Sequence, residues 1–166
     1  MDAAIKTSSL ILTLSEKIKL YQKENKLSNS KLAKFSLLTE GTIRTIVNTN
    51  ATNIELKTLI KLSTFFNTPL HELFVKTKKL KVVPASIVNK ELFESAMTAA
   101  KNGIGTQITL ITKRKEIKPE YLSLLVGDMD YSDTTKYLNG KINLTLLTIV
   151  RFSIGLKTPV TSILRY

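Results

Sequence analysis

The chain has 166 residues, 43% hydrophobic and 23% charged, so it can bury a core and is not a disordered tail. It contains 25 lysine and arginine residues against 13 aspartate and glutamate residues, which gives a formal net charge of +12. There is no cysteine, which excludes disulfides and thiolate metal ligands and fits a reducing cytoplasm. Because the basic excess is spread along the chain, nucleic acid fits better as a partner than an acidic metabolite. An anionic membrane is the competing partner, but the sequence has no run of about eighteen apolar residues and no strongly basic amphipathic face.

The first predicted elements are two helices. Ser15 is a good N-cap, and apolar residues at helical spacing follow it, which predicts a helix over 15–26. The apolar stretch 10–12 either extends this helix or forms a partner strand. Ser28 is the next cap, which places a short helix over 29–36.

A third short helix follows a turn, with Thr39 as its N-cap and bounds at 40–48. Its pattern separates an apolar side from a polar side. The inward residues are Ile43, Ile46 and Val47, and the outward residues are Glu40, Thr42, Arg44 and Thr45.

The asparagine-rich stretch 48–53 predicts a loop, since asparagine tolerates left-handed backbone. Apolar periodicity predicts a fourth helix over 55–66. Pro69 then begins a last short helix that runs through Phe74.

The middle of the chain predicts a connector. Residues 76–83 are basic and β-branched, which indicates an extended strand or a linker. A helical pattern over 89–102 ends at Gly103 in the manner of a C-cap.

The sequence then repeats itself ninety positions on, because residues 14–74 fall on 104–164. The identical pairs include Ile18 with Ile108, Leu32 with Leu122, Asn53 with Asn143, Leu56 with Leu146 and Pro69 with Pro159. Residues 106–112 favour a strand by local propensity, whereas the repeat requires a helix there, and we follow the repeat.

The second copy predicts the same order of helices. Pro119 begins its second helix, and Asp130 caps a helix through Leu138 whose register slips by one residue relative to the first copy. Asn139, Gly140 and Lys141 predict the next turn. Two helices over 145–156 and 159–164 close the unit.

The spacing of the first copy resembles the helix-turn-helix unit of the lambda-repressor/Cro (XRE) family over about sixty residues. The matching stretches are Ser28-x-x-x-Leu32-Ala33, Thr39-x-x-Thr42-Ile43-x-x-Ile46, Leu56-x-x-Leu59-x-Lys61-Leu62 and Pro69-x-x-x-Leu73-Phe74. Leu37 stands at the turn position where the family often has glycine, and the family's loop glycine after the third helix is absent.

The resemblance and the repeat together predict a mostly α protein with two tandem five-helix helix-turn-helix units and a short β element in the connector. The predicted domains are 1–75 and 104–166, with the connector over 76–103. The repeat thus indicates an internal duplication.

The resemblance also implies which residues meet DNA. The residues implied to contact bases are Glu40, Gly41, Thr42, Arg44, Thr45, Tyr131, Ser132, Thr135 and Lys136. Those implied to contact phosphates are Asn29, Asn48, Thr49, Asn50, Asn53, Asn139, Gly140, Lys141 and Asn143. In the second copy, Asp128, Asp130 and Asp133 bring negative charge near the phosphates, which favours a packing role for that unit as the alternative.

The sequence offers little support for an enzymatic function. His71 is the single histidine, and we expect it to serve as a surface or capping residue. Gly103 and Gly105 are not followed by the Gly-Lys-Ser/Thr of a phosphate-binding loop. We therefore expect no catalytic site, no metal, no cofactor and no small-molecule ligand.

The resulting hypothesis is a cytoplasmic, sequence-specific regulator of transcription that binds double-stranded DNA and acts as a repressor. Its two units would form a pseudo-dimer within one chain, either as a monomer or as part of a homodimer. The composition, rich in Lys, Asn, Ile and Thr, hints at a bacterial, plasmid or phage source. The alternatives are an adaptor or antitoxin whose second unit binds a protein, and a non-specific nucleoid-type binder.

Overall fold

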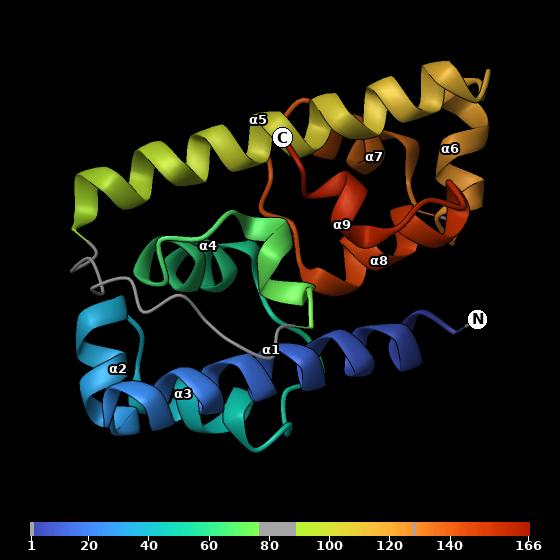
Figure 1. The fold of residues 1–166 in the computed structure, drawn as a ribbon. Helices are drawn as coiled ribbons and strands as arrows, with labels where there is room; N and C mark the ends of the chain where they lie inside the picture. Colours follow the sequence, from blue (N-terminus) through green and yellow to red (C-terminus); the bar gives the residue numbers. More distant parts are fainter. Residues whose placement is uncertain (1, 77–88, 128) are drawn as a thin grey trace.

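The computed structural model describes residues 2–76, 89–127 and 129–166 (Figure 1). Within these ranges every regular element is helical, and one antiparallel β-bridge pairs Glu55 with Thr145. The β element expected at 76–83 falls almost wholly outside the described residues. In chain order the elements are α1 (Ala3–Asn25), α2 (Asn29–Ser36), α3 (Glu40–Val47), α4 (Leu56–Phe65), η1 (Leu70–Phe74), α5 (Lys90–Arg114), α6 (Pro119–Leu125), α7 (Tyr131–Leu138), α8 (Leu146–Gly155) and α9 (Val160–Ile163).

Helix α1 is twelve residues longer at its start than the sequence predicted. Its N-cap is Asp2, whose carboxylate accepts a hydrogen bond from the Ala4 amide at 2.9 Å. The prediction of Ser15 as a cap was wrong, because Ser15 is buried inside the helix and its hydroxyl donates to the Val47 carbonyl at 2.7 Å. Residues 10–12 extend the helix, and Ile11 packs in the core.

The short helices α2 and α3 begin where their caps predicted. The Ser28 hydroxyl accepts from the Lys31 amide at 3.3 Å, and the Thr39 hydroxyl accepts from the Thr42 amide at 3.1 Å. Leu37 lies between the two helices with φ +56°, in the left-handed region that usually favours glycine. A leucine therefore occupies a left-handed turn position at which glycine would avoid the steric cost.

Helix α4 and the 3₁₀ helix η1 complete the first half. Buried rings at the C-terminal end of α4 meet α1 in an aromatic cluster in which Tyr21, Phe65 and Phe66 have ring centroids 4.8–5.5 Å apart. All three contacts have edge-to-face geometry, the arrangement that aromatic quadrupoles favour.

The expected helix end at Gly103 was wrong. Helix α5 runs on to Arg114, so the domain boundary proposed at 103/104 lies inside one helix. A β-carbon at Gly103 would lie 2.4 Å from the Tyr166 ring, and one at Gly105 would lie 2.1 Å from the Leu138 carbonyl oxygen. The two glycines thus allow close packing rather than ending the helix. Residues 106–112 are helical, as the repeat required.

The helices of the second half follow those of the first at a nearly constant interval. Helices α6, α8 and α9 begin ninety residues after α2, α4 and η1, whereas α7 begins ninety-one residues after α3. This is the slip of one residue that the sequence predicted. It buries Thr134 and leaves Tyr137 half-buried, with its ring 6.3 Å from that of Phe152.

The two halves pack together through reciprocal contacts. Helix α1 lies against α8, α4 lies against α5, and η1 lies against α9. Around the β-bridge, the Leu56 amide donates to the Leu144 carbonyl and the Leu146 amide donates to the Ile54 carbonyl, both at 2.8 Å. Each of these contacts maps onto its partner when the numbering shifts by ninety, so the junction has the form of a two-fold interface.

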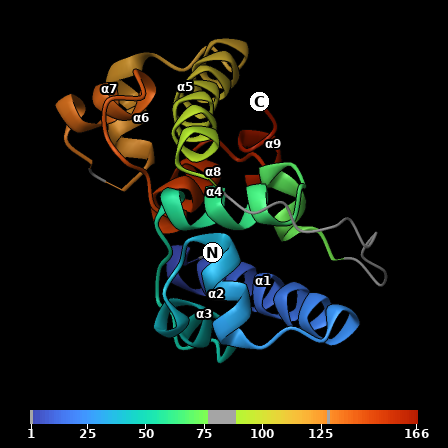
Figure 2. The same ribbon diagram turned by 90° about the vertical axis from the view of Figure 1, so that its left-hand side faces the viewer.

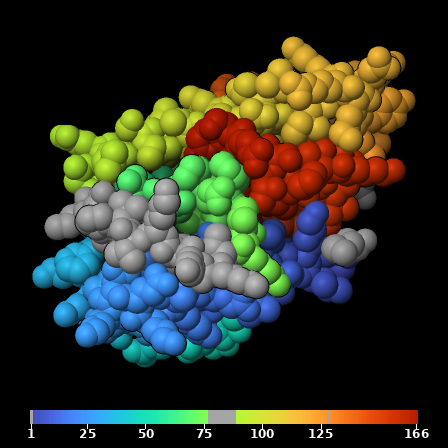
Figure 3. Space-filling view, viewed as in Figure 1, coloured from blue at the N-terminus to red at the C-terminus, as the bar shows by residue number. Residues whose placement is uncertain are grey.

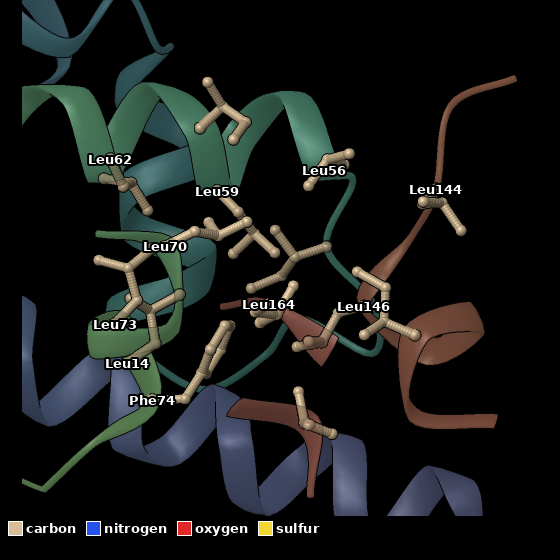
Figure 4. Packing of buried hydrophobic residues seen from close by; sticks show 14 of the residues in the cluster. Leu14, Leu56, Leu59, Leu62, Leu70, Leu73, Phe74, Leu144, Leu146 and Leu164 are labelled. Carbon is tan, nitrogen blue, oxygen red and sulfur yellow. The ribbon is translucent and has the colours of Figure 1, made fainter. Parts of the chain in front are cut away.

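A single hydrophobic core spans both halves. In Figure 4 side chains of the second half, including Leu146 and Leu164, lie near Leu70 and Phe74 of the first, between α4 and α1. Figure 3 shows the C-terminal helices in red between α5 in yellow and α1 in blue, as one continuous surface. Among the described residues, none of the helices has the length and apolar character needed to cross a bilayer.

Candidate nucleic-acid interface

Helix α3 presents a polar side to the surrounding solution and an apolar side to the core. Ile43 and Ile46 are buried, whereas Glu40, Gly41, Arg44 and Thr45 are exposed. Thr42 is half-buried, and its hydroxyl lies 2.8 Å from that of its cap Thr39. The five residues proposed to contact bases therefore lie together on the outer side of one helix.

The only guanidinium on α3 is held by a neighbour on the same helix. Arg44 Nη2 lies 2.9 Å from Glu40 Oε1, and both side chains remain largely exposed. An exposed pair at this spacing is worth only a few tenths of a kcal/mol. The guanidinium can therefore leave the carboxylate for a stronger acceptor at little cost.

Helix α7 repeats this arrangement with different side chains. Tyr131, Ser132, Thr135 and Lys136 are exposed, and Lys136 Nζ lies 2.8 Å from Asp133 Oδ1. The hydrogen bond that Lys136 donates to the Asp133 carboxylate raises the pKa of this lysine. Each half therefore places one cation on this helix and pairs it with a carboxylate on the same helix.

The N-cap of α7 carries a negative charge that α3 lacks. Asp130 Oδ1 accepts from the Ser132 amide at 2.7 Å. The hydroxyl and the amide of Ser132 lower the pKa of Asp130, so this carboxylate is ionised at neutral pH. Thr39, the neutral cap of α3, adds no charge at the equivalent place.

Helices α3 and α7 lie on the same face of the molecule. In Figure 1 α3 lies behind α1 and α7 lies behind α5. In Figure 2, turned by 90°, both appear on the left, with α7 above and α3 below. A long, straight ligand such as a DNA duplex could approach both helices from that side.

The residues proposed to contact phosphates separate into two groups. Asn48, Thr49, Asn50, Asn139 and Lys141 are exposed in the loops that follow α3 and α7. Gly140 has φ +63° and packs closely on α5, where a β-carbon would lie 2.5 Å from Asn102 Oδ1. Asn29 is half-buried, and its Oδ1 accepts from Gln22 Nε2 at 2.8 Å.

The second group, Asn53 and Asn143, lies at the junction between the halves. Asn53 Oδ1 accepts from the amide of Leu147, in the first turn of α8, at 3.0 Å. Asn143 Nδ2 donates to Glu55 Oε2 at 3.2 Å. These two side chains therefore already have partners that join the halves, an arrangement that the sequence did not reveal.

One cation beside α3 was missed by the sequence reasoning. Lys57, in the first turn of α4, lines a cleft of about 420 Å³ between α3 and α4 together with Thr42, Thr45 and Asn53. Its ammonium lies 2.9 Å from Glu55 Oε2. The sequence predicted a helix over 55–66 that follows the loop 48–53. The position of Lys57 at the start of that helix, next to a loop proposed to contact phosphates, was the signal that could have identified it.

Comparison with known proteins bears on the first half only. Residues 17–79 match the family model of the Cro/C1-type HTH DNA-binding domain. The match includes α2, the turn at Leu37 and α3, which are the two helices and the turn of a helix-turn-helix. No curated protein and no solved structure gives a significant match to the chain.

Proposed function

We propose that the protein is a sequence-specific regulator of transcription that binds double-stranded DNA with both halves and represses by occluding a promoter. The observation that carries this proposal is the placement of α3 and α7 on one face of the molecule, with their polar residues exposed (Figure 2). The family match of residues 17–79 supports the DNA-binding role of α3.

The second half is proposed as a second helix-turn-helix unit, the product of an internal duplication. Helices α6 to α9 begin ninety or ninety-one residues after their counterparts in the first half, and the polar helix α7 holds the place of α3 in the helix order. The reciprocal backbone bonds at Ile54–Leu56 and Leu144–Leu146 then take the place of a dimer interface. Such a pseudo-dimer recognises DNA as one chain.

The chemistry of the two recognition helices differs, so the two half-sites are expected to differ. Arg44 and Lys136 can each donate to guanine O6 and N7, and Glu40 can accept from the amino group of cytosine. Thr42 and Ser132 can bond to several base edges. Asn48, Asn50 and Lys141 are free to meet phosphates, whereas we assign Asn53 and Asn143 to the junction.

The test begins with selection of bound fragments from a random duplex library, which yields the site. We expect two unequal half-sites about one helical turn apart, because the junction fixes the two helices relative to each other. Inserting about five base pairs between the half-sites turns them to opposite sides of the duplex and should abolish tight binding.

Mobility-shift titrations of variants then assign the roles. Arg44→Ala should cost about 1–3 kcal/mol and relax the preference at one base, whereas Lys141→Ala should weaken binding to all sequences alike. Lys157→Ala is the control, because it precedes α9, which lies on the opposite side of the molecule in Figure 2. Equal effects of Arg44→Ala and Lys141→Ala on every sequence would contradict the assignment.

The alternative function is an adaptor or antitoxin in which the second half binds a protein. It is favoured by the ionised Asp130 cap on α7 and by a family match that stops before α5. A selected site with one half-site only, together with unchanged binding by Lys136→Ala, would support this alternative. A non-specific binder would instead show no preferred site and a steep loss of affinity with salt.

A further inference from the structure

Helix α6 exposes an apolar face that its counterpart α2 does not have. Tyr121, Leu124 and Leu125 follow one another at i, i+3 and i+4, and they are 56%, 61% and 45% exposed. Ninety residues earlier stand Lys31, Lys34 and Phe35, so α2 carries two ammonium groups where α6 carries a tyrosine and a leucine. Clustered apolar residues on a solvent-exposed helix face indicate a contact surface. We call these three residues the α6 patch.

The core does not need the α6 patch. Leu122 and Ser123, on the other side of α6, are buried against the rest of the molecule. Helix α8 approaches α6 so closely that a β-carbon at Gly155 would lie 2.4 Å from the Leu125 carbonyl oxygen. The helix is thus fixed by its inner side, and its apolar outer side remains available to another molecule.

Charge and shape at the α6 patch favour a second copy of the same chain. The end at which α6 begins is net basic, because four cations there outnumber two carboxylates: Lys113, Arg114, Lys115 and Lys118 against Glu116 and Glu120. The ionised Asp130 follows the other end of the helix. If two α6 helices pair antiparallel, the basic end of each meets the acidic end of the other. Leu125 also borders a cleft of about 220 Å³, lined with Ala3, Val126, Ile154 and one charged residue, Arg151. Its apolar part can accept an aliphatic side chain such as Leu124 of the second copy.

We propose that the α6 patch is the interface of a homodimer in which the α6 helices of two copies pack antiparallel about a two-fold axis. The contact is isologous, so it closes at two copies. Helix α2 cannot form the same contact at the other end of the molecule. Lys31 and Lys34 occupy the equivalent positions there, and the lysines of two copies would repel one another.

The dimer would extend the proposed DNA interface. In Figure 1 α6 lies at the opposite end of the molecule from α2, so copies joined through α6 lie end to end. Two such copies would occupy two neighbouring DNA sites cooperatively. This consequence rests on the proposed function, whereas the dimer itself does not.

Sedimentation velocity of the full chain without DNA tests the dimer. We expect the wild type to move from the 18.6 kDa monomer to a dimer as its concentration rises from low micromolar to millimolar. Leu124→Lys and Tyr121→Lys, which install the residues found on α2, should abolish the dimer and leave the helical circular dichroism unchanged. Leu12→Lys is the matched control, because Leu12 is 50% exposed on α1, and it should dimerise like the wild type.

The possible outcomes separate this proposal from the proposed function. A wild type that stays monomeric at every concentration, or a dimer that survives Leu124→Lys, would overturn the α6 interface. If Leu124→Lys is monomeric and still binds a single selected DNA site with wild-type affinity, the dimer and the DNA interface are independent, as proposed. Loss of dimerisation in Leu12→Lys as well would place the interface elsewhere.

Discussion

The two halves of the molecule arrange their helices alike but fill their interiors differently. In the first half, Phe65 of α4 packs edge-to-face on Tyr21 and Phe66. In the second half, the equivalent position is Gly155, and the backbone of α6 approaches α8 directly. The ring of Phe65 thus packs α4 against α1, whereas Gly155 lets α8 approach α6, so equivalent positions serve contacts with different helices in the two halves.

A second difference of this kind lies between the long helices and the recognition helices. Ser15 of α1 donates its hydroxyl to the Val47 carbonyl at the end of α3. The equivalent residue of α5 is Gly105, which lets the Leu138 carbonyl at the end of α7 come close to the helix. Both solutions fix the C-terminal end of the helix that we propose to read DNA.

These differences show which features the architecture requires. The starts of the short helices and the reciprocal junction are kept in both halves. The caps, core-filling residues and exposed faces are not, since Ser28 caps α2 through its side chain whereas Lys118 does not cap α6. The largest divergence is on the surface, where Lys31 and Lys34 of α2 correspond to Tyr121 and Leu124 of α6. Four predictions test how far the stability of each half depends on the residues in which the two halves differ.

The largest effect is expected at the aromatic cluster. Phe65→Ala removes a fully buried ring and should lower the free energy of unfolding by about 4 kcal/mol. Urea denaturation followed by circular dichroism measures the loss. Because one core spans both halves, the variant should still unfold in a single transition. Two separate transitions would show that the halves fold independently.

A somewhat smaller loss is expected at the close approach of α5 and α7. Gly105→Ala places a methyl group 2.1 Å from the Leu138 oxygen, so the helices must separate, at a cost of about 3 kcal/mol. The matched control is Gly41→Ala on α3, where the nearest atom would be 3.8 Å away. That change should stabilise the helix by up to about 1 kcal/mol. Similar destabilisation by both alanines would contradict the packing role of Gly105.

The sequence predicted correctly the helix starts that are fixed by a capping residue next to them. Ser28, Thr39 and Asp130 are caps in the structure, and α2 begins and ends at the predicted residues. The start of α1 was missed because two structures share one local pattern. A serine followed by apolar residues can be an N-cap, or it can be a buried serine in the middle of a helix. The hydrogen-bond partner of Ser15 is thirty-two residues away, and no local pattern contains it.

The same limit applies to the candidate site. Helical periodicity predicted which residues of α3 face outward, and the structure agrees for Glu40, Arg44 and Thr45. It could not show that Asn53 and Asn143 bond across the junction, since their partners Leu147 and Glu55 belong to the other half. Gly103 was misread for a related reason, because the tight contact that requires it is with Tyr166.

The turn of the helix-turn-helix offers a gain in stability. Leu37 has φ +56°, and the glycine in the equivalent turn of the second half, Gly127, has φ +91°. Leu37→Gly should raise the free energy of unfolding by about 1 kcal/mol, because a left-handed backbone costs an L-residue about 1–2 kcal/mol. Thermal and urea unfolding of the single variant measure this gain. Gly127→Ala should show the opposite sign, and a loss of stability in Leu37→Gly would mean that the leucine side chain contributes more than the strain removes.

The smallest effect separates the neutral cap of α3 from the charged cap of α7. Hydrogen bonds from Ser132 lower the pKa of Asp130 below its usual 3.8, so the folded state favours the carboxylate. The ionised cap therefore stabilises the folded state at every pH above 3.8, the pKa in the unfolded chain. This stabilisation is lost as the pH falls through the lower pKa of the folded state. Asp130→Asn keeps an acceptor, so it should match the wild type at neutral pH and remove this acid-side dependence. The chemical shift of the Ser132 amide, followed by NMR during an acid titration, reports the change directly. The Thr42 amide, bonded to the hydroxyl of Thr39, is the internal control and should show no such titration; a flat Ser132 shift in the wild type would rule out the charged cap.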